Sequence, residues 1–170
     1  MVIALFSQEI NESVSEVIQS FLTSKFSKDS KFFIEKKLLS EIKYNNKLDI
    51  IPFNKSKDLY SEIDLMVSIG GDGTFLRTIE YVRDLAIPVM GINTGNLGFL
   101  ATIKKENLDQ AIDKIYNRKF KIENRSLIKV NSDEIGLPKS FFPYALNEVS
   151  VVRKDTTSMI NIKTSLDGSN

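Results

Sequence analysis

The chain has 170 residues, with 23 Lys or Arg, 22 Asp or Glu, and neither cysteine nor histidine. This length suffices for one domain with a sizeable core, or for one small domain and part of another, and the balanced charge favours neither nucleic acid nor an anionic membrane as a partner. The missing residue types exclude a disulfide framework, thiolate metal sites and Ser-His catalysis, so any metal must be held by oxygen.

No apolar run approaches the length of a membrane span, and the N-terminus lacks a basic segment and a cleavage site. We therefore expect a cytoplasmic protein without membrane partners. The first apolar run, Val2–Phe6, is typical of a buried parallel strand, and an apolar stripe over residues 14–22 predicts a helix that Asn11 or Ser13 can cap.

The turn between these two elements, residues 7–12, contains no glycine. A dinucleotide-binding dehydrogenase would carry Gly-x-Gly-x-x-Gly there, so that class is not favoured. The periodicity of apolar residues is weaker in the next segment. It predicts a strand at residues 32–34, a helix around residues 35–44 and an apolar segment at residues 48–51.

The chain is organised around residues 64–77, which predict a strand, a glycine turn and a helix. The apolar run Leu65–Ile69 predicts a strand buried on both faces, and an apolar stripe over residues 75–85 predicts the helix. The turn between them forms a candidate phosphate loop: Gly70, Gly71, Gly73 and Thr74. Its glycines let the backbone take positive φ and let a ligand approach closely, while the free N–H groups and dipole of the helix start favour phosphate.

Asp72 lies within this turn and admits two interpretations. Asp is a preferred N-cap residue, so it can satisfy free N–H groups of the following helix. Alternatively, a carboxylate beside bare backbone suits a phosphorylated ligand whose hydroxyl must be aligned for attack, and Asp72 would orient that hydroxyl and accept its proton. The residues of the turn leave both interpretations open.

A second strand and glycine loop follow at residues 87–98. Residues 87–92 repeat the buried-strand pattern, and the loop after them carries Asn93, Gly95 and Gly98. Two parallel strands with glycine loops at their carboxyl ends would place both loops along the crevice where open α/β sheets bind ligands. A tight pair of turns is the alternative, because Asn and Gly tolerate left-handed geometry.

The pattern changes beyond residue 101. A helix is predicted over residues 106–118, and strand-like runs follow at residues 120–131, 144–152 and 159–166. The predicted fold class is therefore α/β: a Rossmann-like open parallel sheet, followed by the start of an all-β, antiparallel, sandwich-like second domain. We place the α/β nucleotide-binding domain at residues 1–102, and the linker helix with the first strands of the incomplete second domain at residues 103–170.

Three motifs resemble those of NAD kinases. Gly-Gly-Asp-Gly-Thr at residues 70–74 is similar to a signature shared by NAD kinases, diacylglycerol-type lipid kinases and, more loosely, phosphofructokinases. Asn-Thr-Gly-Asn-Leu-Gly-Phe-Leu at residues 93–100 is similar to the Asn-x-Gly-x-Leu-Gly-Phe-Leu motif of NAD kinases, and Asn147 with Glu148 matches their Asn-Glu pair. The three motifs stand in the family's order and cover most of the chain.

The resemblance implies transfer of the γ-phosphoryl group of ATP to the 2′-hydroxyl of the adenosine ribose of NAD, which gives NADP. It implies that Asp72 accepts the proton or aligns the hydroxyl, and that magnesium is held largely by triphosphate oxygens and water rather than by a protein metal site. Ser158 stands where many members have His or Arg. The implied NAD-binding residues are Asp72, Gly73, Arg77, Phe99, Asn147, Glu148 and Ser158. We also expect a homo-oligomer, either a dimer or a tetramer.

Two alternatives stay open. A lipid kinase would share residues 70–74 but would not be expected to carry residues 93–100 or the Asn-Glu pair. A non-catalytic nucleotide-binding fragment is favoured because the Thr- and Gly-rich loop and the Gly-Gly-Pro of NAD kinases are missing. Asp167 and Gly168 are a hairpin signal with no return strand, so we expect this chain, as given, to be a C-terminally truncated fragment without kinase activity.

Overall fold

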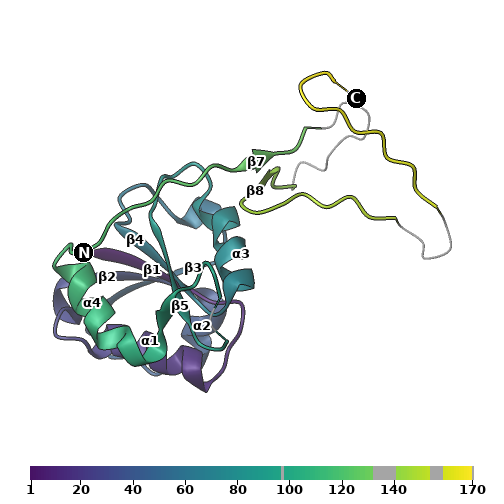
Figure 1. Ribbon diagram of the computed structural model, residues 1–170. Coiled ribbons are helices and arrows are strands. Elements are labelled where there is room, and N and C mark those ends of the chain that lie inside the picture. Colours follow the sequence, from purple (N-terminus) through teal and green to yellow (C-terminus); the bar gives the residue numbers. More distant parts are fainter. Residues whose placement is uncertain (97, 132–140, 154–158, 170) are drawn as a thin grey trace. The chain divides into compact units, whose positions relative to one another are not determined.

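The computed structural model describes residues 1–96, 98–131, 141–153 and 159–169 (Figure 1). The chain divides into two compact units, Met1–Arg125 and Ser126–Asn170, which we call the first and the second unit. The first unit continues past residue 102, where the sequence predicts a domain boundary, and it includes the helix predicted over residues 106–118.

The first unit is built on a six-stranded parallel sheet with the order β3-β2-β1-β4-β5-β6. The strands are β1 Val2–Phe6, β2 Lys31–Glu35, β3 Asp49–Phe53, β4 Leu65–Ile69, β5 Val89–Asn93 and β6 Ile103–Lys104. The helices are α1 Glu12–Thr23, α2 Lys36–Glu41, α3 Asp72–Val82 and α4 Leu108–Tyr116, with 3-10 turns at Ser27–Asp29, Ser56–Asp58 and Lys105–Asn107. The strand order reverses between β1 and β4, which is where open α/β sheets bind ligands. The predicted α/β fold class is confirmed.

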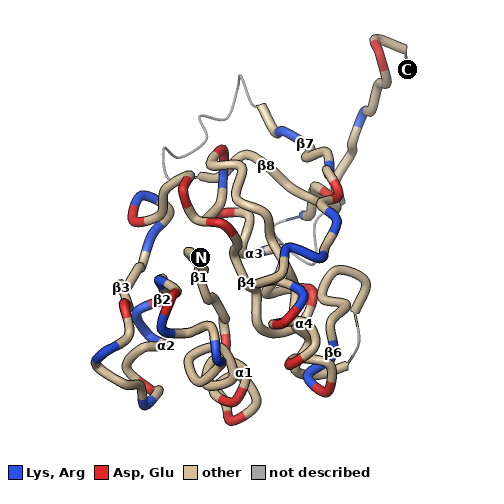
Figure 2. Tube along the Cα trace, turned by 90° about the vertical axis from the view of Figure 1, so that its left-hand side faces the viewer, with Lys and Arg blue, Asp and Glu red and all other residues tan. Residues whose placement is uncertain are grey.

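Apolar cores cover both faces of this sheet, and β1 shows how the sequence divides between them. Ile3 and Leu5 point to the face covered by α1, α2 and α4, whereas Ala4 and Phe6 point to the face covered by α3 (Figure 1). All four side chains are buried because neighbouring residues of a strand point to opposite faces of a sheet that is covered on both sides. Basic and acidic residues are interspersed over the surface of the unit (Figure 2).

The first two helices differ in how they begin. Of the two predicted caps of α1, Asn11 is the one used: its Oδ1 accepts a hydrogen bond from the backbone N–H of Val14 at 3.0 Å. α2 follows β2 directly, and the carboxylate of Glu35 caps it. α2 ends at Glu41, three residues before the predicted end, because Ile42 turns to an extended conformation and packs into the core.

The second unit contains little regular structure. β7, Ile128–Lys129, pairs antiparallel with β8, Tyr144–Ala145. The strands predicted over residues 120–131 and 144–152 are therefore only two residues long, and the strand predicted over residues 159–166 is wrong, since Leu166 makes only an isolated bridge to Ser169. An alternating pattern gives a segment one apolar face, but a β-ladder also needs a partner strand. In the described part of this unit, strand pairing is limited to β7 with β8.

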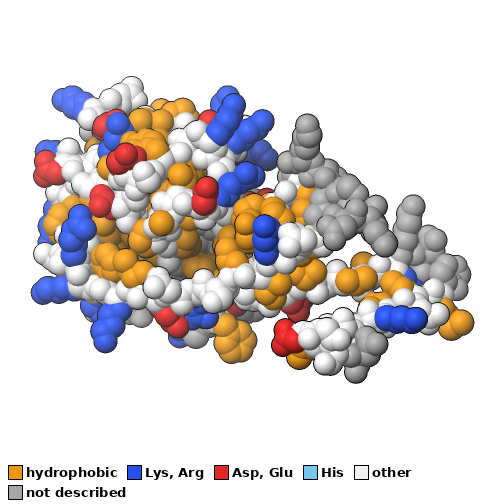
Figure 3. Space-filling model, turned by 90° about the horizontal axis from the view of Figure 1, so that it is seen from above, with side chains coloured by type: hydrophobic (Ala, Val, Ile, Leu, Met, Phe, Trp, Pro, Cys, Tyr) orange, Lys and Arg blue, Asp and Glu red, His pale blue; other side chains and the backbone are white. Residues whose placement is uncertain are grey.

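Large apolar side chains of the second unit are consequently open to solvent (Figure 3). The most exposed of these are Val151, Val152, Met159 and Leu166. Within the described ranges of the chain, no helix is both long enough and apolar enough to cross a membrane.

Candidate functional site

The candidate site lies where β4 ends and α3 begins. Gly70 has a φ of +146°, which L side chains rarely adopt, and a Cβ there would lie 2.5 Å from Thr74 Oγ1. Its N–H donates to the carbonyl of Ile92 at 2.9 Å and so ties the turn to β5. The turn itself therefore requires glycine at position 70.

Gly71 and Gly73 have no such requirement within the protein. Neither has a positive φ, so within this turn the freedom of glycine to take positive φ is used at Gly70 and not at these two. A Cβ on either would meet nothing within 4 Å, and both residues are exposed. The backbone of Gly71 and Gly73 is thus open to close approach from outside, at the N-terminus of α3.

Asp72 is anchored to the second glycine loop. Its Oδ2 accepts the backbone N–H of Phe99 at 2.8 Å, and its Oδ1 accepts those of Leu100 at 2.9 Å and Ala101 at 3.0 Å. Asp72 is the first residue of α3, whose N-cap is Gly71 and has no side-chain cap bond. The interpretation of Asp72 as the cap of its own helix is therefore wrong: its carboxylate holds residues 99–101 instead.

These three donors also set the charge of the carboxylate. The hydrogen bond from Ala101, followed by those from Phe99 and Leu100, lowers the pKa of Asp72 below its ordinary value, and the opposing effect of burial is smaller. Asp72 is therefore ionised at neutral pH. A carboxylate of this kind is a weak proton acceptor and a good hydrogen-bond acceptor.

Gly98 makes this arrangement possible. A Cβ at that position would lie 2.2 Å from Oδ1 of Asp72 and 2.6 Å from its Oδ2, so only glycine lets the loop approach the carboxylate this closely. The side chain of Phe99, the next residue, is 94% exposed. Gly98 thus has a structural role in the loop, whereas Phe99 offers an aromatic face to solvent.

Asn93 closes the same loop on itself. Its Nδ2 donates to the carbonyls of Asn96 at 2.8 Å and Ala101 at 3.3 Å, while its Oδ1 accepts the N–H of Gly95 at 2.8 Å. The side chain is only 4% exposed. Asn93 therefore satisfies backbone groups of the loop and fixes the segment whose N–H groups hold Asp72.

Comparison with known proteins decides the family. Residues 7–120 match the family model of the ATP-NAD kinase N-terminal domain. The chain belongs to the NAD kinase family. The family predicted from the three motifs is thereby confirmed.

Curated NAD kinases of several bacteria are similar to most of the chain. The NAD kinase of Christiangramia forsetii is 38% identical over 169 residues, which are 98% of this chain and 58% of that protein. The NAD kinase of Bacteroides fragilis is 40% identical over 135 residues, 77% of this chain and 43% of that protein. The matched part is thus 58% of the length of the first relative and 43% of the length of the second.

A solved structure shares the fold. The crystal structure of yeast NADH kinase complexed with NADH superposes with a TM-score of 0.61 at 19% identity, covering 78% of this chain and 44% of that chain. At this identity the likeness supports the α/β architecture of the NAD kinase fold and leaves the ligands of this chain to be argued from its own residues.

Other residues predicted from the NAD kinase motifs are spread more widely. Thr74 is buried and its carbonyl accepts the hydroxyl of Thr78, while Arg77 lies on the exposed face of α3 and bonds to Glu80 at 2.8 Å. Asn147 and Glu148 are exposed residues of the second unit that follow β8, and Ser158 lies outside the described residues. The structure thus brings Asp72 together with residues 98–101, while the remaining assignments stay predictions.

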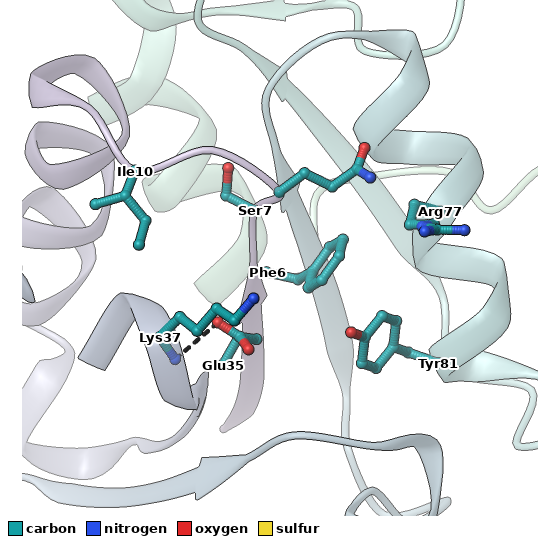
Figure 4. A pocket seen from close by; sticks show the side chains of 8 residues that line it. Phe6, Ser7, Ile10, Glu35, Lys37, Arg77 and Tyr81 are labelled. Atoms are coloured by element: carbon teal, nitrogen blue, oxygen red, sulfur yellow. Dashed lines mark hydrogen bonds between the residues drawn. The ribbon is translucent and has the colours of Figure 1, made fainter. Parts of the chain in front are cut away.

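The motifs did not reveal a cavity of about 200 Å³ at the carboxyl ends of β1 and β2 (Figure 4). Its aromatic and aliphatic lining consists of Phe6, Ile10 and Tyr81. Its polar lining consists of Ser7, Gln8, Glu35, Lys37 and Arg77. Arg77 alone among these was predicted. The signal that could have found the cavity is Glu35, an acid that directly follows the strand predicted at residues 32–34.

Proposed function

We propose that this protein is an ATP-dependent NAD kinase, which transfers the γ-phosphoryl group of ATP to the 2′-hydroxyl of the adenosine ribose of NAD. The observation that carries the proposal is the ionised carboxylate of Asp72, held by three backbone donors beside the open backbone of Gly71 and Gly73. Because the chain spans little more than half of its curated relatives, the proposal concerns the activity of the full gene product.

Asp72 aligns the acceptor hydroxyl in this reaction. An ionised carboxylate has about four acceptor sites, and the three backbone donors leave room for one more hydrogen bond, from the ribose 2′-hydroxyl. The bond from that oxygen to the γ-phosphorus forms as the bond from phosphorus to the β,γ-bridging oxygen breaks, and the proton passes to Asp72. Phosphoryl transfer is loose and depends mainly on positioning, so a weak base suffices.

Magnesium, the oligomeric state and the location complete the proposal. Magnesium would enter with ATP, held by triphosphate oxygens and water, and would neutralise charge on the transferring phosphate. Asp72 already directs its oxygens at backbone donors, so we assign it no metal. A cytoplasmic location is the expectation from the sequence, and a homo-oligomer, dimer or tetramer, rests on the resemblance to NAD kinases. The further NAD contacts at Asn147, Glu148 and Ser158 rest on it too.

The test supplies radiolabelled ATP and magnesium with either NAD or diacylglycerol to the 170-residue chain and to the full product of its gene. We expect NADP from the full product, no labelled lipid from either, and almost no NADP from the 170-residue chain, since loss of positioning costs most of the rate. Labelled lipid without NADP would favour the lipid kinase, and equal NADP from both proteins would refute the need for further residues.

A glycine of the turn gives a second test. Gly73→Ala should leave the free energy of unfolding unchanged or raise it by up to about 1 kcal/mol, because Ala suits a helix and its Cβ meets nothing within 4 Å. Turnover of the full product should nevertheless fall by about 100-fold, as expected for a displacement of a substrate by about 1 Å. Thermal unfolding and NADP formation would be measured on the same preparation. Unchanged turnover would show that no substrate approaches this backbone.

A further inference from the structure

We infer that the cavity beyond β1 and β2 binds the nucleoside end of the phosphoryl donor, with the ribose diol on Glu35 and the phosphates directed along Arg77 toward the glycine turn. This inference rests on the proposed function and extends it, because it assigns the donor a site on one side of the turn and the acceptor ribose a site on the other. Four observations lead to it.

The first observation is the position of the cavity relative to Asp72. Asp72 is bonded to residues 99–101, which follow β5, whereas the cavity is lined by residues at the ends of β1 and β2. In the sheet, β1 and β5 flank β4 on opposite sides. The glycine turn after β4 therefore lies between the two places, where a phosphoryl group held at the turn could be approached from both.

The second observation is the incomplete hydrogen bonding of Glu35. Its side chain is only 5% exposed, and Oε2 accepts the N–H groups of Lys37 at 2.9 Å and Leu38 at 3.2 Å. Oε1 accepts no hydrogen bond from the described residues, although the carboxylate lines the cavity (Figure 4). Oε1 is not enclosed by the described protein atoms, so it is open to a ligand in the cavity. The hydroxyls of a ribose are donors of suitable size for it.

The third observation is the apolar part of the lining. The rings of Phe6 and Tyr81 are 4.6 Å apart between centroids, and Ile10, half exposed, lies across the cavity from them (Figure 4). Burial, and then the charge of Glu35, raise the pKa of Tyr81, so its hydroxyl stays a neutral donor. Aromatic and aliphatic surfaces of this kind suit the faces of a nucleobase.

The fourth observation is the combination of charge and size. Lys37 on α2 and Arg77 on α3 line the cavity, and Arg77 lies about one helical turn beyond Gly73. A purely anionic ligand would meet Glu35 unfavourably, whereas a nucleotide presents hydroxyls to the acid and phosphates to the cations. The volume of about 200 Å³ is smaller than the roughly 300–1,000 Å³ of pockets that enclose a whole drug-sized ligand. The phosphates must therefore extend out of the cavity.

The main experiment is calorimetry of the 170-residue chain, in magnesium and without NAD, with ATP and with 2′,3′-dideoxy-ATP. We expect ATP to bind about tenfold more tightly than the dideoxy compound, the difference that a hydrogen bond to a charged group makes. Glu35→Gln should bind the two equally, because the charged acceptor is gone. Circular dichroism would establish that this variant keeps its helices, since the amide oxygen of Gln can still cap α2.

A second pair of variants keeps the test independent of Glu35. Lys37→Ala should weaken ATP binding severalfold and adenosine binding little, because a single exposed cation contributes modestly to phosphate binding. The matched control is Lys36→Ala: Lys36 is also exposed, lies in the same turn of α2 and does not line the cavity. ATP binding by this control should equal that of the unaltered chain.

Three results would overturn the inference: no saturable ATP binding by the chain at millimolar concentration, equal binding of ATP and dideoxy-ATP, or equal effects of the two lysine variants. Failure of the proposed function would look different. The full gene product would then form no NADP, while ATP binding by the chain would still depend on Glu35 and Lys37.

Discussion

Asp72→Asn is expected to lower the turnover of the full gene product by about 10²- to 10⁴-fold, the usual contribution of a positioned acid or base. Asn keeps one oxygen that can accept the N–H groups of Leu100 and Ala101, but it turns an amide toward Phe99 and loses the negative charge. The loop should thus stay in place in most molecules while the acceptor hydroxyl loses its partner. NADP formation per folded molecule is the measurement.

The matched control for this variant is Asp109→Asn. Asp109 is likewise an acid in the first turn of a helix, α4, but it is exposed and lies away from the glycine turn. Its replacement should leave turnover unchanged. If Asp72→Asn also retained near-normal turnover, with only a lower melting temperature, Asp72 would be a residue that holds the loop and has no part in the chemistry.

Gly98→Ala is expected to lower turnover by about 100-fold, because the new methyl group would displace the Asp72 carboxylate by an ångström or more. Its Cβ would lie 2.2 Å from Oδ1, and contacts this short cannot persist, so the carboxylate must leave at least some of its three donors. Gly95→Ala is the control from the same loop, since a Cβ at that position meets nothing within 4 Å. That variant should keep its turnover.

The double variant shows whether Gly98 acts through Asp72. Groups in direct contact give non-additive effects, so Gly98→Ala should cost little further turnover once Asp72 is already Asn. If the two losses multiply instead, Gly98 contributes through another contact, such as direct approach of a substrate to its backbone. Thermal unfolding of all three variants would separate loss of folded protein from loss of activity.

Local patterns in the sequence determine much of the first unit. β1 and β4 are short apolar runs, and α1 and α3 carry apolar stripes. These elements form close to the predicted positions because a strand or helix needs little beyond a consistent apolar face, although α3 ends at Val82 and not at residue 85. The glycine turn was likewise visible, since three glycines around an acid are rare in an ordinary helix start. These features indicated the fold class and the family.

Tertiary structure alone decided which residues of the site contact one another. The donors to Asp72 lie 27 to 29 residues further along the chain, and they reach it because β5 pairs with β4 and returns the second loop to the turn. Glu35 meets a cavity because β2 lies beside β1. The strand predicted over residues 159–166 is absent for a related reason, because a strand needs a neighbouring strand to pair with. Such partners, distant in the sequence, come together only in the folded chain.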